Sequence, residues 1–425
     1  MRLCVFEDAG ALNLEPLSLT RPAFDLLLGA GTQLDRLRRL FPADEIGVVV
    51  RPGLAELCRR SRPNLAVNDA DWLRRGAVLF VNARWLPAAV PATYPEAGEV
   101  GLASEQVAYA AVPSADLDDA TPAHLAGRLA EWQRDPAARP AGGVLLNYLW
   151  HFVDHNADAL AQDHVFWRSQ KKRPTAADGL TVLGPREQVV VDPDAKVEPH
   201  VVIDATRGPV LIDREAVVQA FSRVEGPCYL GPGTQVLAAR VRGGSFGPQC
   251  RLGGEVESSV VQGFSNKYHD GFLGHSYVGE WVNFGAGSHT SDLRTDYGPI
   301  KMTVNGAAVQ SGVIKIGSYL GDHTRMSINT LLNTGSVVGP FGLLLTSGTL
   351  LPRVIPPFCR YGHGRVQERT DLREMFATAA TVMARRGQEW TPAHEELYLG
   401  LYEQTAAERS RVLRESEQNR LRRVV

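Results

Sequence analysis

Aliphatic residues recur at every sixth position through much of the second half of this 425-residue chain. One run keeps a single register over Ile212, Val218, Val224, Leu230 and Val236, and another over Ile314, Leu320, Met326, Leu332, Val338 and Leu344. Glycine often follows the aliphatic residue, as in Leu230–Gly231, where a corner needs a small residue or positive φ. This period predicts a left-handed parallel β-helix of hexapeptide repeats, a three-sided prism filled by the aliphatic side chains.

The repeats extend over residues 180–351. A two-sheet sandwich is the alternative fold, but it would show an alternation of period two instead of six. Two stretches, Gly263 to Gly271 and Ser291 to Ala308, break the register, and we expect both to leave the prism as loops that carry function. Residues 352–425 begin with several prolines and continue with helical spacing, which predicts a C-terminal helical region.

Residues 1–156 alternate short apolar runs with amphipathic segments. The runs 3–6, 46–50 and 78–81 are predicted strands, and the segments 32–41 and 54–60 are predicted helices. This alternation is typical of an α/β domain with a largely parallel sheet. Such sheets bind ligands in the loops beyond the carboxyl ends of their strands. Residues 157–179 are predicted to link this domain to the prism.

Composition excludes several classes of partner. The formal net charge is -2, with 44% hydrophobic and 22% charged residues, so that neither nucleic acid nor an anionic membrane is an expected partner. The five cysteines are scattered and form no CxxC pair, which argues against a disulfide framework and a structural zinc site. No apolar run approaches a membrane span, and no secretory signal is recognisable, so we expect a cytoplasmic protein.

Two motifs carry a resemblance to a known family. The segment KYHDGFLGHSYVGEWVNFGAGSHTSD, from Lys267 to Asp292, resembles the acetyltransferase half of bifunctional enzymes that acetylate glucosamine 1-phosphate and then uridylylate the product. His269 stands four residues before Leu273–Gly274, and Asn283 opens NFGAG at the family's spacing. The N-terminal half resembles a divergent group of the same family, described as sugar nucleotidyltransferases, through Glu7–Asp8 and the loop PLSLTRP at residues 16–22.

The resemblance implies roles in the second half of the chain. His269 would be the general base, since an imidazole can take the proton that the sugar amine loses. The substrate-binding candidates are Asn283, Phe272, which replaces a tyrosine of the family, and Lys301, which would neutralise the sugar phosphate. Ala286, Asp292 and Asp322 would lie near acetyl-coenzyme A, and the assembly implied is a homotrimer. Alternatively, His269 is an ordinary histidine in a loop, and Asp322 forms part of a turn at a corner of the prism.

In the N-terminal half the candidates lie in the loops after the strands. Arg21, with Thr20 beside it, is the candidate for binding phosphate, and Asn82 and Arg84 follow the strand at 78–81. Asp8, or Glu7, is the candidate for holding Mg²⁺. The family's glycine-rich nucleotide loop is absent, and Asn82 stands where a metal-binding Asp is expected. Alternatively, Arg21 forms an ion pair with Asp25 instead of binding phosphate, and Asp8 caps a turn instead of holding a metal.

The remaining histidines of the prism, His275, His289 and His323, invite a metal site, but no pair has ligand spacing. The predicted function is therefore a sugar-1-phosphate nucleotidyltransferase and acetyltransferase. It would make UDP-N-acetylglucosamine from glucosamine 1-phosphate, acetyl-coenzyme A and UTP with Mg²⁺. Two alternatives stay open: a sugar nucleotidyltransferase with a structural β-helix, and a non-catalytic regulator that binds sugar nucleotides.

Overall fold

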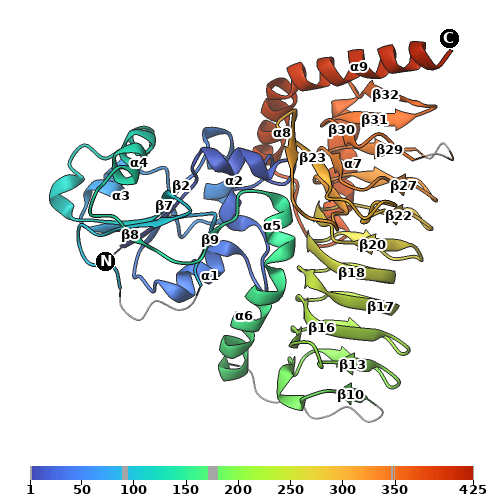
Figure 1. The fold of residues 1–425 in the computed structure, drawn as a ribbon, viewed down its shortest axis with the longest axis horizontal. Coiled ribbons are helices and arrows are strands. Elements are labelled where there is room, and N and C mark those ends of the chain that lie inside the picture. Colours follow the sequence, from blue (N-terminus) through green and yellow to red (C-terminus); the bar gives the residue numbers. More distant parts are fainter. Residues whose placement is uncertain (1, 89–93, 171–179, 346–347, 349, 425) are drawn as a thin grey trace. The chain divides into compact units, whose positions relative to one another are not determined.

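The computed structural model describes residues 2–88, 94–170, 180–345, 348 and 350–424 (Figure 1). The chain forms two compact units. The first comprises Met1–Leu14, Arg21–Leu26 and Gly31–Tyr148, and the second comprises Glu15–Thr20, Leu27–Ala30 and Leu149–Val425. Two short pieces of the loop after the first strand thus belong to the second unit. Of the expected linker 157–179, the first part is helical, and residues 171–179 lie outside the described residues.

The first unit contains a seven-stranded sheet with the strand order β3-β2-β1-β4-β7-β6-β8. β1, β2, β3 and β4 are parallel, and β7 joins β4 in antiparallel orientation. The strands are β1 (Arg2–Phe6), β2 (Ile46–Val49), β3 (Ala66–Val67), β4 (Val78–Asn82), β5 (Trp85–Leu86), β6 (Val100–Ala103), β7 (Gln106–Val112), β8 (Arg139–Pro140) and β9 (Val144–Leu145). The helices are α1 (Gln33–Leu40), α2 (Pro52–Ser61), α3 (Ala70–Arg74) and α4 (Leu125–Gln133). The predicted α/β domain is confirmed.

The register of this sheet brings three loops to one edge. Phe6 lies opposite Val49 of β2 and Asn82 of β4, so the residues that follow these three strands emerge together. Buried side chains such as Cys4, Phe6 and Phe80 hold the strands against the neighbouring helices. The carboxyl edge of the sheet is therefore the place where Glu7, Asp8, Arg51 and Arg84 can interact.

The second unit is built around a parallel β-helix in which inward side chains stack in columns. One column runs through Ile203, Val224, Val241, Val256 and Leu273. A second runs through Ile212, Leu230, Phe246, Val261, Val278, Leu320, Val338 and Ile355. A third begins with Val197, Val218, Val236, Leu252 and Lys267. Each fully buried aliphatic side chain stabilises the fold by about 1.5–3 kcal/mol, and the predicted β-helix is confirmed.

The coils consist of short strands. Before the loop region they are β10 (Thr181–Leu183), β11 (Val189–Val191), β12 (Lys196–Val197), β13 (Val202–Asp204), β14 (Val210–Ile212), β15 (Val217–Val218), β16 (Arg223–Leu230), β17 (Gln235–Phe246), β18 (Arg251–Gly263), β19 (Asn266–Lys267), β20 (Phe272–Gly274), β21 (Tyr277–Glu280) and β22 (His289–Thr290). After it they are β25 (Ser318–Leu320), β26 (Arg325–Met326), β27 (Leu331–Leu332), β28 (Ser336–Val338), β29 (Leu343–Leu344), β30 (Val354–Ile355), β31 (Cys359–Gly362) and β32 (Arg365–Glu368).

Glycines after the inward residues are needed because neighbouring coils approach closely. A Cβ on Gly285 would lie 2.3 Å from the carbonyl carbon of Ser327, and one on Gly339 would lie 2.3 Å from the nitrogen of Pro357. Positive φ occurs instead at a corner occupied by aromatic residues. The rings there stack from coil to coil: Phe264, Trp281, His323, Phe341 and Phe358.

Three details of the expected prism are wrong. The segment from Gly263 to Gly271 stays in the coil, because β19 pairs in parallel with Arg251 and Leu252 and an inward Lys267 takes the aliphatic position. Ile314 is 51% exposed, since the chain there is still returning from the hairpin of β23 (Lys301–Val304) and β24 (Ala307–Gln310). Parallel pairing also continues past residue 351, to Tyr361 of β31.

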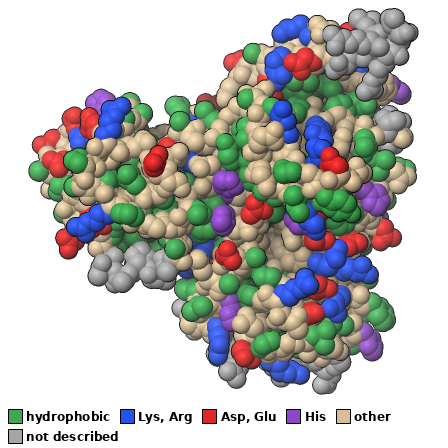
Figure 2. Space-filling model, in the orientation of Figure 1, with side chains coloured by type: hydrophobic (Ala, Val, Ile, Leu, Met, Phe, Trp, Pro, Cys, Tyr) green, Lys and Arg blue, Asp and Glu red, His purple; other side chains and the backbone are tan. Residues whose placement is uncertain are grey.

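Helices complete the second unit. α5 (Leu149–Asp154) and α6 (Asn156–Gln170) precede the prism, and α7 (Leu372–Ala384), α8 (Pro392–Gln404) and α9 (Ala406–Val424) follow it. α7 and α8 pack on the aromatic corner through Phe376 and Tyr398, which contact Phe341. Within the described residues every helix is too short or too polar to cross a membrane. Basic and acidic side chains are interspersed on the face drawn in Figure 2.

Candidate functional site

At the carboxyl edge of the first unit, Asp8 and Arg84 form a buried ion pair. Arg84 donates from Nε to Asp8 Oδ1 at 2.7 Å and from Nη2 to Oδ2 at 2.5 Å, and its side chain is 1% exposed. Asn82 Nδ2 donates to the same carboxylate at 2.8 Å, as does the backbone N–H of Gly10 at 3.1 Å. Burial tends to raise the pKa of Asp8, but the hydrogen bonds and charge of Arg84 outweigh it and lower the pKa.

Glu7 fastens the loop after β1 to the same edge. Its carboxylate accepts hydrogen bonds from the Arg51 side chain at 3.1 and 3.2 Å, from the Arg51 backbone, and from the backbone N–H of Ala23. The carbonyl of Arg21 accepts a further bond from Arg51 at 3.3 Å. Glu7 therefore holds the end of the PLSLTRP loop against the sheet.

The residues at this edge do not fit Mg²⁺. Both carboxylate oxygens of Asp8 are bound by a guanidinium, Glu7 is bound by Arg51, and the position expected for a metal-binding Asp holds the neutral Asn82. No group of three or more His, Cys, Asp or Glu side chains suited to a metal occurs among the residues that the structure describes. Asp8 instead caps a turn and pairs with Arg84, as the turn-capping alternative expects.

Thr20 and Asp322, which were candidates for two different ligands, bind each other. Thr20 Oγ1 donates to Asp322 Oδ2 at 2.7 Å, and the backbone N–H of Glu280 donates to Oδ1 at 2.8 Å. Both residues are buried, because the neighbouring Leu19 packs with Phe341 on the aromatic corner. These contacts favour the corner-turn alternative for Asp322 over binding of coenzyme A, and they make Thr20 part of the packing of the second unit.

Arg21 is 8% exposed, and its charge acts on Asp25. Asp25 also forms an ion pair with Arg62. Burial raises the pKa of Asp25 to about 6, although the charges of Arg62 and Arg21 oppose this shift. A buried guanidinium at this position is still compatible with the predicted phosphate contact.

His269 lies at an exposed corner between β19 and β20. Its ring contacts Tyr268 edge-on, with ring centroids 5.1 Å apart, and its backbone carbonyl accepts a hydrogen bond from Lys267 Nζ at 2.6 Å. Phe272 is half-buried on β20, where its backbone N–H donates to Nδ1 of His289 at 3.2 Å. The backbone of the His269 corner is thus held from inside the prism, while no carboxylate among the described residues orients its imidazole.

Lys267 is the unusual group beneath that corner. It is 3% exposed, and its ammonium donates to the carbonyls of Gly253 at 2.9 Å and His269. Burial lowers its pKa to about 8, opposed in part by Asp270. Between pH 8 and about 10.5 the unfolded chain therefore binds a proton that the folded chain has lost, so the free energy of unfolding rises with pH.

We expect Lys267→Met to remove the rise of the unfolding free energy between pH 8 and about 10.5. Relative to the variant, the wild-type chain should gain at most about 3 kcal/mol in unfolding free energy over that interval. Urea unfolding at several pH values measures it, with the exposed Lys196→Met as the matched control. Parallel pH curves for the wild type and Lys267→Met would contradict the lowered pKa of the buried Lys267.

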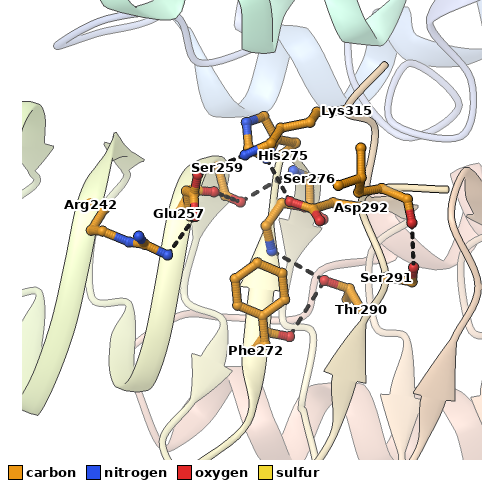
Figure 3. Close-up of polar contacts among 12 residues, drawn as sticks. Arg242, Glu257, Ser259, Phe272, His275, Ser276, Thr290, Ser291, Asp292 and Lys315 are labelled. Carbon is orange, nitrogen blue, oxygen red and sulfur yellow. Dashed lines mark hydrogen bonds and ion pairs between the residues drawn. The ribbon is translucent and has the colours of Figure 1, made fainter. Parts of the chain in front are cut away.

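An imidazole–carboxylate pair joins His275, one hexapeptide after His269, to Asp292 on the next coil (Figure 3). Nδ1 of His275 is 2.7 Å from Oδ2 of Asp292, and the two side chains are 15% and 12% exposed. The backbone fixes both residues: the N–H of Gly317 donates to the carbonyl of His275, and that of Ile316 donates to the carbonyl of Asp292. A carboxylate at Nδ1 orients the ring and leaves Nε2 as the proton-accepting nitrogen, which is the arrangement of an oriented general base.

Charged side chains surround this pair. Lys315 binds Glu257 at 3.2 Å, Arg242 binds both Glu255 and Glu257, and the backbone N–H of His275 donates to the carbonyl of Glu257 (Figure 3). Asp154 of α5 is also close enough to be affected by the charge of His275. Both cations near the pair are thus held by the carboxylates of Glu255 and Glu257.

The other predicted residues of the second unit lie apart from one another. Asn283 is exposed on the outer face of the prism, where its Oδ1 accepts from Asn266 Nδ2 at 2.8 Å. Ala286 is half-buried, and its carbonyl accepts from the backbone N–H of Asn329. Lys301 is exposed at the start of the hairpin β23–β24. Asp292, by contrast, pairs with the imidazole of His275.

The sequence interpretation missed the pairing of His275 with Asp292. The two residues are 17 positions apart, which is close to the 18 residues of one complete coil. Residues separated by one coil lie next to each other on adjacent turns of the prism. A search for acid–histidine pairs at that separation could have found this site, whereas a search for metal-ligand spacing could not.

Comparisons with known proteins agree with the resemblance of the two motifs. Residues 3–172 match the family model described as "Sugar nucleotidyl transferase". The chain is 31% identical over 147 residues to the "Bifunctional sugar-1-phosphate nucleotidylyltransferase/acetyltransferase" of Sulfurisphaera tokodaii, covering 32% of this chain and 35% of that relative. It is 30% identical over 165 residues to the "Bifunctional protein GlmU" of Methanocaldococcus jannaschii, covering 36% and 38%.

A match to the "Bifunctional protein GlmU" of Bartonella bacilliformis reaches 32% identity over 219 residues, covering 48% of this chain and 42% of that relative. The chain thus spans between 35% and 42% of the length of these three relatives. The resemblance to this family that the two motifs predict is confirmed.

Proposed function

We propose, from the sugar nucleotidyl transferase domain of residues 3–172 and the similarity to bifunctional relatives, that this chain is a sugar-1-phosphate transferase whose prism acetylates an amino sugar. The acceptor is the amine of glucosamine 1-phosphate, and the donor is acetyl-coenzyme A. The oriented pair of His275 and Asp292 carries this proposal, because N-acylation needs a base that is neutral and correctly placed when the amine attacks.

In this mechanism Asp292 accepts a hydrogen bond from Nδ1–H of His275, so that Nε2 faces the amine. As the new C–N bond forms and the thioester C–S bond breaks, Nε2 takes the proton of the amine and then passes it to the departing thiolate. Lys301, which is exposed on the hairpin, neutralises the sugar phosphate. Ala286 presents backbone groups to the acyl donor. We also propose that the chain forms a homotrimer, as the resemblance to the family implies. Light scattering measures the mass of the assembly.

His269 is the second candidate for the base. It has the family's spacing and a fixed backbone, whereas His275 has an orienting carboxylate. An unpartnered imidazole samples several rotamers and both tautomers, so less of its population is ready to accept the proton. We therefore assign the base to His275 and a substrate-contacting role to His269.

For the first unit we propose recognition of a sugar nucleotide. Arg21, Asn82 and Arg84 lie at the edge where an α/β sheet binds its ligands. Transfer of the uridylyl group from UTP to a sugar 1-phosphate, with release of pyrophosphate, would need Mg²⁺, but Asp8 and Glu7 are engaged by arginines. This observation favours a second candidate function for this unit, the binding of sugar nucleotides without turnover.

Paired product assays on the complete chain test these proposals. With glucosamine 1-phosphate and acetyl-coenzyme A, we expect release of free thiol that depends on the amino sugar. With UTP and N-acetylglucosamine 1-phosphate, release of pyrophosphate would contradict the binding-only candidate for the first unit. Thiol release that is no faster than without acceptor would reject the acetyltransferase.

A further inference from the structure

A concave pocket of about 320 Å³ lies between the outer face of the prism and the end of α7. None of the residues that line it is acidic. Its polar lining consists of Arg251, Asn266, Asn283, Arg325, Arg385 and Arg386. The first four of these are stacked on successive coils, and the last two follow directly after α7. Hence two separate parts of the chain bring four guanidinium groups to one concave surface.

The positive charge in this pocket is uncompensated. No ion pair joins any of the four arginines to a carboxylate within the described residues, and Arg386 donates instead to the backbone carbonyl of Gln249 at 2.8 Å. Burial lowers the pKa of Arg386, and the charges of Arg251 and Arg385 lower it further. Like charges held this close repel each other, which is costly unless an anion neutralises them.

Two polar atoms of the pocket also lack partners. Nε of Arg251 and Oδ1 of Asn266 are buried and have no hydrogen-bond partner, although Nδ2 of Asn266 donates to Asn283. A buried donor or acceptor without a partner costs about 1–3 kcal/mol, so such atoms usually mark a missing ligand or water. Here one is a cationic donor suited to a phosphate oxygen, and the other is an acceptor suited to a hydroxyl group.

We propose that this pocket binds an organic diphosphate that also carries hydroxyl groups, such as a nucleoside diphosphate or its sugar ester. Guanidinium forks match the geometry of phosphate oxygens, and several of them can neutralise the charges of two linked phosphates. The acceptor of Asn266 would receive a hydroxyl. The lining of the pocket includes Asn283, the predicted substrate-binding residue, but neither His275 nor Asp292. Occupation of the pocket does not depend on acyl transfer.

Calorimetric titration of the complete chain at low salt tests this site. Inorganic pyrophosphate and UDP are expected to bind, UDP more tightly, whereas free glucose is not. Arg325→Gln and Arg251→Gln should each raise the Kd for UDP by about 10- to 100-fold, since each removes a charge-assisted contact. The matched control is Arg360→Gln, an exposed arginine further along the same outer column, which should change the Kd less than about 2-fold.

Melting temperatures without ligand separate binding from folding. Removal of one of several like charges relieves repulsion, so Arg325→Gln should melt at the same temperature as the wild type or higher. A lower melting temperature would mean that the arginine stabilises the fold, and it would overturn the proposal. So would a wild-type chain that binds neither pyrophosphate nor UDP, or a Kd that is equal in the pocket variants and in Arg360→Gln.

Discussion

Replacement of His275 by Gln is expected to lower kcat for acyl transfer by about 100- to 10,000-fold, while KM for the amino sugar phosphate changes little. Glutamine keeps a hydrogen bond to Asp292 but cannot accept a proton. The base must be neutral, so the wild-type rate should fall on the acid side of the pH profile. That acid limb should disappear in the variant. Initial rates of thiol release across the pH range measure both effects.

Asp292→Asn and His269→Gln are the informative companions. Asp292 acts through the imidazole, so its variant should keep KM but lose kcat and shift the acid limb of the pH profile, because the carboxylate no longer selects the tautomer. His269→Gln is the matched control on the same segment and should reduce kcat by less than about 10-fold. If His269→Gln abolished turnover while His275→Gln retained it, our assignment of the base would be wrong.

Replacement of Arg84 by Gln is expected to lower the unfolding free energy of the first unit by about 3–5 kcal/mol, since it leaves Asp8 buried without its cation. The comparison is Arg60→Gln, which removes an exposed pair with Glu56 and should cost less than about 1 kcal/mol. Urea unfolding measures both. A loss for Arg84→Gln as small as that for Arg60→Gln would contradict the structural role of the Asp8–Arg84 pair.

The Asp8–Arg84 pair also makes the free energy of unfolding depend on pH. Because the pKa of Asp8 is lowered in the folded chain, its contribution is fully present above the unfolded pKa of about 3.9. The contribution is lost as the pH falls through the lower, folded pKa. The difference in stability between the wild type and Arg84→Gln should therefore narrow below about pH 4.

The period of six predicted the prism because the inward position repeats whatever the outward residues are. It failed where a polar side chain takes that position: Lys267 points inward and binds carbonyls, so the coil around it looked like an insertion. Ile314 fitted the period by coincidence, since the chain there has not yet rejoined the prism. The type of a side chain therefore predicts whether it is buried only where the core consists of apolar residues.

The candidate site was harder to predict than the fold. Spacing within one segment pointed to His269, but orientation of a base depends on contacts between coils, which bring Asp292 to His275. The PLSLTRP loop was interpreted as a phosphate loop, yet its Leu19 packs on the aromatic corner that α7 and α8 also cover, and its Thr20 binds Asp322. Packing of this kind joins distant parts of the chain and leaves no local pattern.

The most direct measurement follows the acetyl group itself. Acetyl-coenzyme A labelled with ¹³C at the carbonyl is incubated with glucosamine 1-phosphate and the complete chain, and the label is observed by NMR. Transfer to the amine predicts an amide carbonyl signal that grows with time and depends on His275. Label that stays in the thioester, or that appears only as free acetate, would contradict acyl transfer by the prism.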